Sequence, residues 1–122
     1  MPPHIQLGKK GEELAAGWLT SKGYTILHRN WRHGRYEVDI IAARQTVIHI
    51  IEVKCRQSTA YGHPEASVSR KKIEHLLQAA SAWLYRYPGY ARVQYDVLAI
   101  TLRKKEEPEY FMTSLVCYRG QR

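Results

Sequence analysis

Two apolar segments separated by only two residues constrain the fold of this chain more than any other feature. They are residues 36–43 and 46–55, and the connection between them is Arg44-Gln45. Both segments contain β-branched residues, which predicts strands, and so short a connection predicts that they form an antiparallel hairpin. The second segment is apolar over residues 47–51 apart from His49, as in a strand that is covered on both faces.

The other elements follow from the spacing of apolar residues and from residues that begin or end helices. Helices are predicted over residues 8–22 and from the N-cap Ser69 to Pro88-Gly89. Strands are predicted over residues 24–31, 92–102 and 110–117, with a basic turn at 32–35 and a loop at 56–64. This order is typical of an α/β protein with a mixed β-sheet flanked by helices. A chain of 122 residues is expected to form a single domain over residues 1–122.

Two pairs of charged residues interrupt the predicted hairpin strands. They are Glu37 with Asp39, and Glu52 with Lys54. Since strand side chains alternate between the two faces of a sheet, the members of each pair share a face. In a hairpin, Asp39 and Glu52 are then expected to approach one another. Acidic groups in apolar surroundings are costly unless a cation or hydrogen bonds compensate, and Lys54 supplies a single positive charge.

The excess of carboxylates predicts a divalent cation, Mg²⁺ or Mn²⁺. Mg²⁺ prefers oxygen ligands, commonly one or two carboxylates completed by water and substrate phosphate. Asp39 and Glu52 fit this role, and the carbonyl oxygen of Val53 offers a third ligand. The implied reaction is phosphodiester hydrolysis, with Lys54 orienting the attacking water or stabilising the transition state. The alternative is an ordinary cross-strand ion pair of Lys54, although the apolar residues on the face of Glu52 favour the metal site.

The chain is strongly basic, with 19 Lys and Arg against 11 Asp and Glu, a formal net charge of +8 and a pI near 9.7. Such a charge favours polyanionic partners, of which nucleic acid is the commonest. The candidate phosphate contacts are Arg32 and Arg35 before the first charged strand, Arg56 after the second, and Arg70, Lys71 and Lys72 at the start of the second helix. Cations at a helix N-terminus oppose the helix dipole, which favours an anion nearby. For each residue singly, a solvated surface position is the alternative.

Nine features of the sequence closely resemble the YraN-like family of uncharacterised bacterial proteins, in the same order and over nearly the whole chain. They are GEELA at 11–15, GYTIL at 23–27, NWR at 30–32, EVDIIA at 37–42, IEVKCR at 51–56, YGHP at 61–64, ASVS at 66–69, Lys72 and YDV at 95–97. That family resembles the PD-(D/E)xK nuclease superfamily and, within it, the archaeal Holliday-junction resolvases. The resemblance implies a restriction-endonuclease-like core of the order α-β-β-β-α-β.

The resemblance also implies roles for individual residues. Asp39, Glu52 and Lys54 match the active residues of the superfamily, and Glu12 on the first helix matches an additional acid that reaches the metal. The competing interpretation of Glu12 is a favourable acid in the first turns of a helix. Glu37 belongs to a motif of the family, but the resemblance implies no role for it.

Two residues depart from the pattern of the family. The residue before Glu37 is Tyr36 where the family usually has glycine, and a side chain there is expected to crowd the approach of a substrate. The residue two positions before Asp96 is Gln94 where the family usually has arginine, which removes one expected phosphate contact. Both departures concern affinity for the substrate more than the chemistry.

The sequence therefore predicts a Mg²⁺- or Mn²⁺-dependent endonuclease acting on DNA, and by analogy with the resolvases on branched or structured DNA as a homodimer. Two alternatives stay open: a nucleic-acid-binding module without catalysis, and an interaction protein whose basic surface binds an acidic partner. No apolar run approaches the roughly 20 residues of a membrane span, and the N-terminus lacks the pattern of a signal peptide. A cytoplasmic protein without membrane association is expected.

Overall fold

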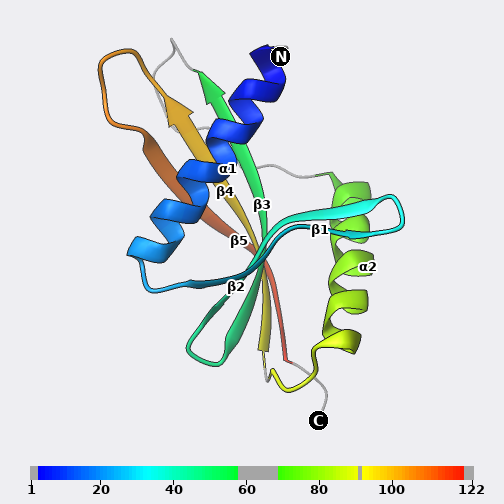
Figure 1. Cartoon of the computed structure of the whole chain (residues 1–122). Helices are drawn as coiled ribbons and strands as arrows, with labels where there is room; N and C mark the ends of the chain where they lie inside the picture. The colour runs from blue at the N-terminus through cyan, green and yellow to red at the C-terminus, as the bar shows by residue number, and fades with distance from the viewer. Residues whose placement is uncertain (1–2, 58–68, 91, 120–122) are drawn as a thin grey trace.

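The computed structural model describes residues 3–57, 69–90 and 92–119 (Figure 1). Its elements in chain order are α1 (Pro3–Ser21), β1 (Thr25–His33), β2 (Tyr36–Arg44), β3 (Val47–Gln57), α2 (Arg70–Arg86), β4 (Arg92–Leu102) and β5 (Glu109–Arg119). The predicted order of helices and strands is confirmed, including the last strand, which was predicted at 110–117 and is β5 in the structure. Most of the predicted loop at 56–64, and the matching segments at 61–64 and 66–68, lie outside the described residues.

The five strands form one sheet in the order β1-β2-β3-β4-β5. β3 and β4 are parallel, whereas the other neighbouring strands are antiparallel. A parallel pair requires a crossover, and α2 supplies it. The predicted mixed sheet is therefore confirmed, as is the hairpin of β2 and β3, in which Arg44 pairs with Val47.

The two helices cover opposite faces of the sheet (Figure 1). On one face Leu19 of α1 packs in a cluster with Ile51, and on the other Trp83 of α2 packs in a cluster with Ile48 and Ile50. Alternate residues of β3 thus belong to different clusters, as a strand buried on both faces requires. None of the described helices has the length and apolar character needed to span a membrane.

His49 lies in the core, where its imidazole has a hydrogen-bond partner within the protein, and it is not positioned as a metal ligand. Its side chain is 4% exposed, and Nδ1 lies 2.7 Å from Oδ2 of the fully buried Asp96. Gln94 donates to the other carboxylate oxygen of Asp96 at 2.9 Å. Gln94, where the family resemblance leads us to expect arginine, therefore contacts a buried acid within the protein.

Several predicted boundaries were wrong. α1 begins at Pro3 rather than at residue 8, so Gly8 lies within the helix and does not mark its start. Arg32 and His33 belong to β1 rather than to a turn, since His33 pairs with Tyr36 and the turn contains only Gly34-Arg35. Gly34 has a φ of 61°, a conformation that glycine adopts with little strain and that permits so tight a connection.

The N-cap of α2 gives a first testable prediction. The Ser69 side chain accepts a hydrogen bond from the backbone N–H of Lys72 at 3.1 Å, which confirms the predicted cap. Ser69→Ala is expected to lower the free energy of unfolding by about 1 kcal/mol, because an orphan N–H of the first turn loses its acceptor. Ser69→Asp keeps an acceptor and serves as the control in urea denaturation. Equal losses in the two variants would contradict the capping role.

Candidate metal centre

β2 separates from β3 before it ends, and this separation creates the site. The pairing of β2 with β3 stops at Ile40 and Ile51, whereas β2 stays paired with β1 as far as the hairpin turn. The β1–β2 hairpin bends toward α2 (Figure 1), and both of its strands contact that helix. The sheet therefore opens between β2 and β3 just beyond this last pair. Asp39, which precedes Ile40, and Glu52, which follows Ile51, lie beside the opening.

Asp39 lies at this opening and takes over a hydrogen bond that the sheet no longer makes. Its Oδ2 accepts the backbone N–H of Val53 at 2.8 Å. The pKa of the Asp39 carboxyl is raised from its usual 3.8 to about 7, by burial first and then by the negative charge of Glu52, while the Val53 N–H opposes the rise. Asp39 is thus a partly buried acid whose ionised form the metal-free protein holds poorly.

Glu52 is the second carboxylate at the opening, and its side chain is only 14% exposed. Oε1 lies 3.5 Å from the Nζ of Lys72 on α2, and the buried Oε2 has no hydrogen-bond partner among the described residues. Burial raises the pKa of Glu52, the charges of Lys72 and Lys54 lower it, and that of Glu37 raises it. An unpartnered buried carboxylate oxygen is costly, so this site suits a cation.

Two further acids lie around the pair, and Asn30 links them. Glu12 comes from α1 and Glu37 from β2. With its amide nitrogen turned toward both carboxylates, Asn30 donates to Glu12 Oε1 at 3.0 Å and to Glu37 Oε1 at 3.3 Å. Asn30 has a φ of 53°, a left-handed conformation that asparagine tolerates better than most residues. Sequence reasoning missed this role, although NWR at 30–32 was among the segments shared with the family.

The donor set suits a hard divalent cation. Asp39 and Glu52 offer carboxylate oxygens, and Val53 offers its carbonyl beside the N–H that Asp39 accepts. Within the described parts of the chain, no three His, Cys, Asp or Glu side chains are grouped as a ready metal site. A cation here therefore needs the backbone oxygen, water or substrate phosphate to complete its coordination, as Mg²⁺ commonly does.

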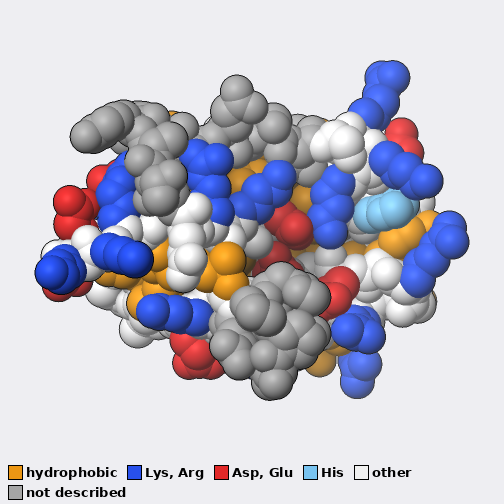
Figure 2. Space-filling model, turned by 90° about the horizontal axis from the view of Figure 1, so that it is seen from above, with side chains coloured by type: hydrophobic (Ala, Val, Ile, Leu, Met, Phe, Trp, Pro, Cys, Tyr) orange, Lys and Arg blue, Asp and Glu red, His pale blue; other side chains and the backbone are white. Residues whose placement is uncertain are grey.

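The predicted basic residues have different positions. Lys72 pairs with Glu52, and Arg32 lies 3.6 Å from Glu37 with its side chain 73% exposed. The remaining four are exposed, namely Arg35, Arg56, Arg70 and Lys71. The guanidinium of Arg35 lies above the ring of Tyr36. In the view from above, acidic side chains lie near the middle of the surface with Lys and Arg side chains on either side (Figure 2). The arrangement is a negative centre within a positive surface.

Tyr36, where the family resemblance leads us to expect glycine, packs against α2. Its ring centroid lies 4.7 Å from that of His75, and the side chain is half-buried. Trp31 adds a hydrogen bond from its indole N–H to the carbonyl of Ala79 at 3.3 Å. These contacts hold the β1–β2 hairpin against α2 and so maintain the opening beside Asp39.

Comparison with known proteins gives matches over most of the chain. A sequence model of the uncharacterised protein family UPF0102 matches residues 11–100. A UPF0102 protein of Phocaeicola vulgatus is 39% identical over 104 residues, 85% of this chain and 86% of that protein. Another, from Chlorobium phaeobacteroides strain BS1, is 44% identical over 99 residues, 80% of this chain and 78% of the relative. The family match at 11–100 includes every residue of the candidate centre.

Among solved structures, this chain is similar to Archaeoglobus fulgidus Hjc, a Holliday junction resolvase from an archaeal hyperthermophile. The TM-score is 0.48 and the sequence identity 18%, over 84% of this chain and 74% of that chain.

Proposed function

We propose that this chain, which belongs to the uncharacterised protein family UPF0102, is a metal-dependent nuclease that hydrolyses phosphodiester bonds in DNA. The observation that carries the proposal is the pair of partly buried carboxylates, Asp39 and Glu52, at the opening of the sheet. Glu52 has a buried oxygen without a partner among the described residues, and Asp39 is held with a pKa of about 7. Such a pair is unfavourable without a cation, whereas a nuclease that binds one gains from the same arrangement.

In this proposal Asp39, Glu52 and the carbonyl of Val53 hold Mg²⁺ or Mn²⁺. A bound ion of this kind lowers the pKa of a coordinated water and neutralises charge that develops on the phosphate. Lys54 lies on β3 with Glu52, and its charge lowers the pKa of the Glu52 carboxyl. The ammonium group of Lys54 suits a scissile phosphate as a point charge, and Lys54 orients the attacking water. Glu12 acts as an additional acid whose orientation Asn30 sets.

The surface charge supports nucleic acid as the substrate. Phosphates are attracted to the Lys and Arg side chains of this surface (Figure 2), and the carboxylates of the centre would repel them in the absence of a cation. Arg56 follows Lys54 on β3, while Arg70 and Lys71 begin α2, so that two basic groups lie at the ends of elements that contribute to the centre. Branched or structured DNA as substrate, and a homodimeric enzyme, are extensions of this proposal that follow from the family resemblance.

The second candidate is a nucleic-acid-binding module without catalysis. It is favoured by one observation: in the described residues the acidic side chains do not form a three-ligand site on their own. The two candidates differ in the effect of metal. A nuclease needs Mg²⁺ or Mn²⁺ for cleavage, whereas a binding module is expected to bind DNA equally well with the metal or with a chelator.

Cleavage of linear, flapped and four-way DNA in Mn²⁺ tests the proposal. Lys54→Met is expected to reduce the cleavage rate by about tenfold or more, because a positive group beside the reacting phosphate is lost. DNA binding is expected to change little, since one exposed charge contributes a small part of the total attraction. Lys104→Met, which removes an exposed lysine in the turn between β4 and β5, is the control and should cleave like the wild type. Absence of Mn²⁺-dependent cleavage of all three DNAs by the wild type would refute the proposal.

A further inference from the structure

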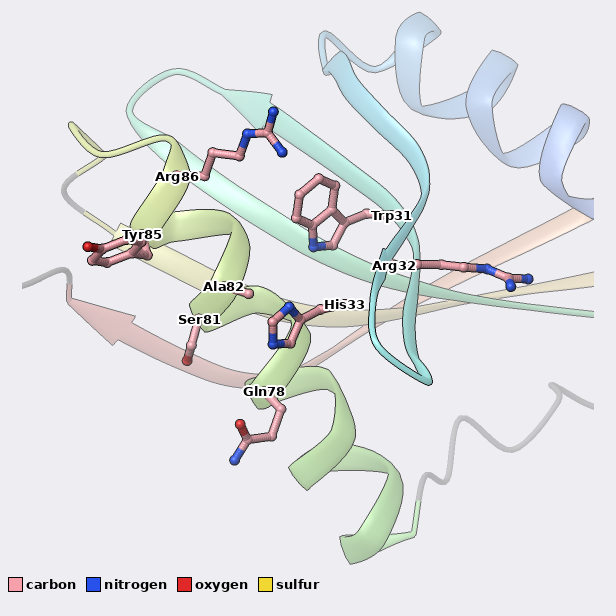
Figure 3. A pocket seen from close by; sticks show the side chains of 8 residues that line it. All are labelled: Trp31, Arg32, His33, Gln78, Ser81, Ala82, Tyr85 and Arg86. Atoms are coloured by element: carbon pink, nitrogen blue, oxygen red, sulfur yellow. The ribbon is translucent and has the colours of Figure 1, made fainter.

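A pocket lies between the β1–β2 hairpin and the outer side of α2 (Figure 3). Its volume is about 690 Å³, within the range of ligand sites in proteins. Trp31 and His33 of β1 point toward α2 and form one wall, whereas Arg32 between them points away. The other wall belongs to α2 and includes Tyr85 and Arg86.

The chemistry of the walls fits an unpaired nucleobase. Trp31 and Tyr85 supply aromatic rings, and Gln78 and Ser81 supply an amide and a hydroxyl for hydrogen bonds to the edge of a base. Tyr85 is 91% exposed. A single exposed aromatic residue is ordinary, but an exposed ring at the rim of a pocket that also holds a cation is suited to stacking with a base.

The charge of the pocket fits a phosphate backbone. Arg86 lies in the last turn of α2, with its guanidinium 5.7 Å from the ring centroid of Tyr87. Among the described residues that line the pocket none is acidic. This positive and aromatic composition favours single-stranded nucleic acid as the ligand. An apolar protein segment is less suitable, because it would bury the Arg86 guanidinium in apolar surroundings.

The pocket and Glu37, one of the acids around the candidate centre, lie on opposite faces of the same hairpin. Arg32 follows Trp31 in β1, and its guanidinium contacts Glu37 on the side away from α2. A DNA strand that follows the hairpin can therefore present a phosphate on one side and a base on the other. We propose that this pocket binds an unpaired base of a DNA substrate, so that the enzyme prefers DNA in which a single-stranded segment adjoins the cleaved bond. The preference rests on the proposed nuclease function, whereas the binding of the base does not.

Fluorescence anisotropy in EDTA, where cleavage is absent, tests the binding directly. The probes are a short oligothymidylate and an abasic oligonucleotide of the same length, which carries the same phosphates without bases. Wild-type protein is expected to bind the oligothymidylate on the order of tenfold more tightly. Tyr85→Ala should remove that difference and leave the affinity for the abasic probe unchanged. Arg86→Gln should weaken binding of both probes by a similar factor, because it removes a phosphate contact.

Phe111→Ala is the matched control, since Phe111 is the other large hydrophobic side chain exposed in the described part of the chain, at 40%. It should keep the wild-type preference for bases. Equal affinity of the wild type for both probes, no measurable binding of either, or an unchanged preference in Tyr85→Ala would each overturn the proposal. If the protein prefers bases but cleaves no DNA in Mn²⁺, the pocket proposal stands and the nuclease proposal fails.

Discussion

Asp39→Asn is expected to lower Mn²⁺-dependent cleavage by about a thousandfold or more and, at the same time, to stabilise the metal-free protein above neutral pH. The loss of cleavage follows because an amide replaces a charged metal ligand, and the ion supplies several kcal/mol of transition-state stabilisation. The gain in stability follows because the side-chain amide oxygen of the variant can still accept the Val53 N–H without bringing a charge into the site.

The pH dependence distinguishes this site from a stabilising ion pair. In the metal-free protein, folding raises the pKa of Asp39 from 3.8 to about 7. Below about pH 4 the Asp39 carboxyl is neutral in both the folded and the unfolded state, so it does not lower the free energy of unfolding. Between about pH 4 and pH 7 folding takes up a proton, so the free energy of unfolding falls as pH rises. Above about pH 7 the full cost is present. We expect a cost of about 2 kcal/mol, after allowance for the solvent that reaches the site.

Thermal unfolding in EDTA and in Mn²⁺ measures both effects. At about pH 8 in EDTA the melting temperature of Asp39→Asn should exceed that of the wild type by on the order of 5 °C, and the difference should shrink toward about pH 4. Added Mn²⁺ should raise the melting temperature of the wild type, because it binds the folded state, and should leave the variant unchanged. Glu74→Gln, which neutralises an acid on α2 away from the carboxylate pair, controls for net charge. A variant less stable than the wild type in EDTA at alkaline pH would identify Asp39 as part of a stabilising ion pair.

Much of this fold was predictable because its signals are local. The two-residue connection between apolar segments predicted the β2–β3 hairpin, and alternation of side chains placed Glu52 on the face of Ile48 and Ile50. Ser69 predicted the start of α2, and residues 92–102 match β4 at both ends. Each of these signals depends on a few neighbouring residues and needs no knowledge of distant contacts.

The shape of the candidate centre was not predictable in the same way, because long-range packing produces it. Sequence reasoning expected Asp39 and Glu52 to face each other in a regular hairpin. Instead, contacts of Trp31 and Tyr36 with α2 draw β2 away from β3, so that Asp39 bonds the backbone of Val53. No sequence pattern reports such a separation of paired strands.

The partners of the acids were missed for the same reason. Lys72 was predicted only as a phosphate contact, whereas in the structure it pairs with Glu52 from a different element. Asn30 joins Glu12 to Glu37 across three elements. The family resemblance contained both residues, but a shared residue does not reveal which side chain it contacts.

Gly11 shows how closely α1 must approach the sheet to bring Glu12 to the centre. A Cβ atom at Gly11 would lie 2.4 Å from Cβ and 3.1 Å from Sγ of Cys55 on β3. A Cβ atom is fixed to the backbone, so helix and strand would have to separate. Gly11→Ala is therefore expected to lower the free energy of unfolding by about 3 kcal/mol, despite the better helix propensity of alanine. Cleavage should fall as well, because Glu12 moves with the helix.

The same substitution further along the helix provides the control. A Cβ atom at Gly17 meets nothing within 4 Å, so Gly17→Ala should stabilise the protein by about 0.5–1 kcal/mol through helix propensity alone. Second-site variants locate the cause in urea denaturation. Cys55→Ala removes Sγ but keeps the Cβ that clashes, so it should not rescue Gly11→Ala, whereas Cys55→Gly removes both atoms and should show a favourable coupling in a double-mutant cycle. If Gly11→Ala is as stable as Gly17→Ala, α1 does not depend on this close approach, and the placement of Glu12 beside Asp39 needs another explanation.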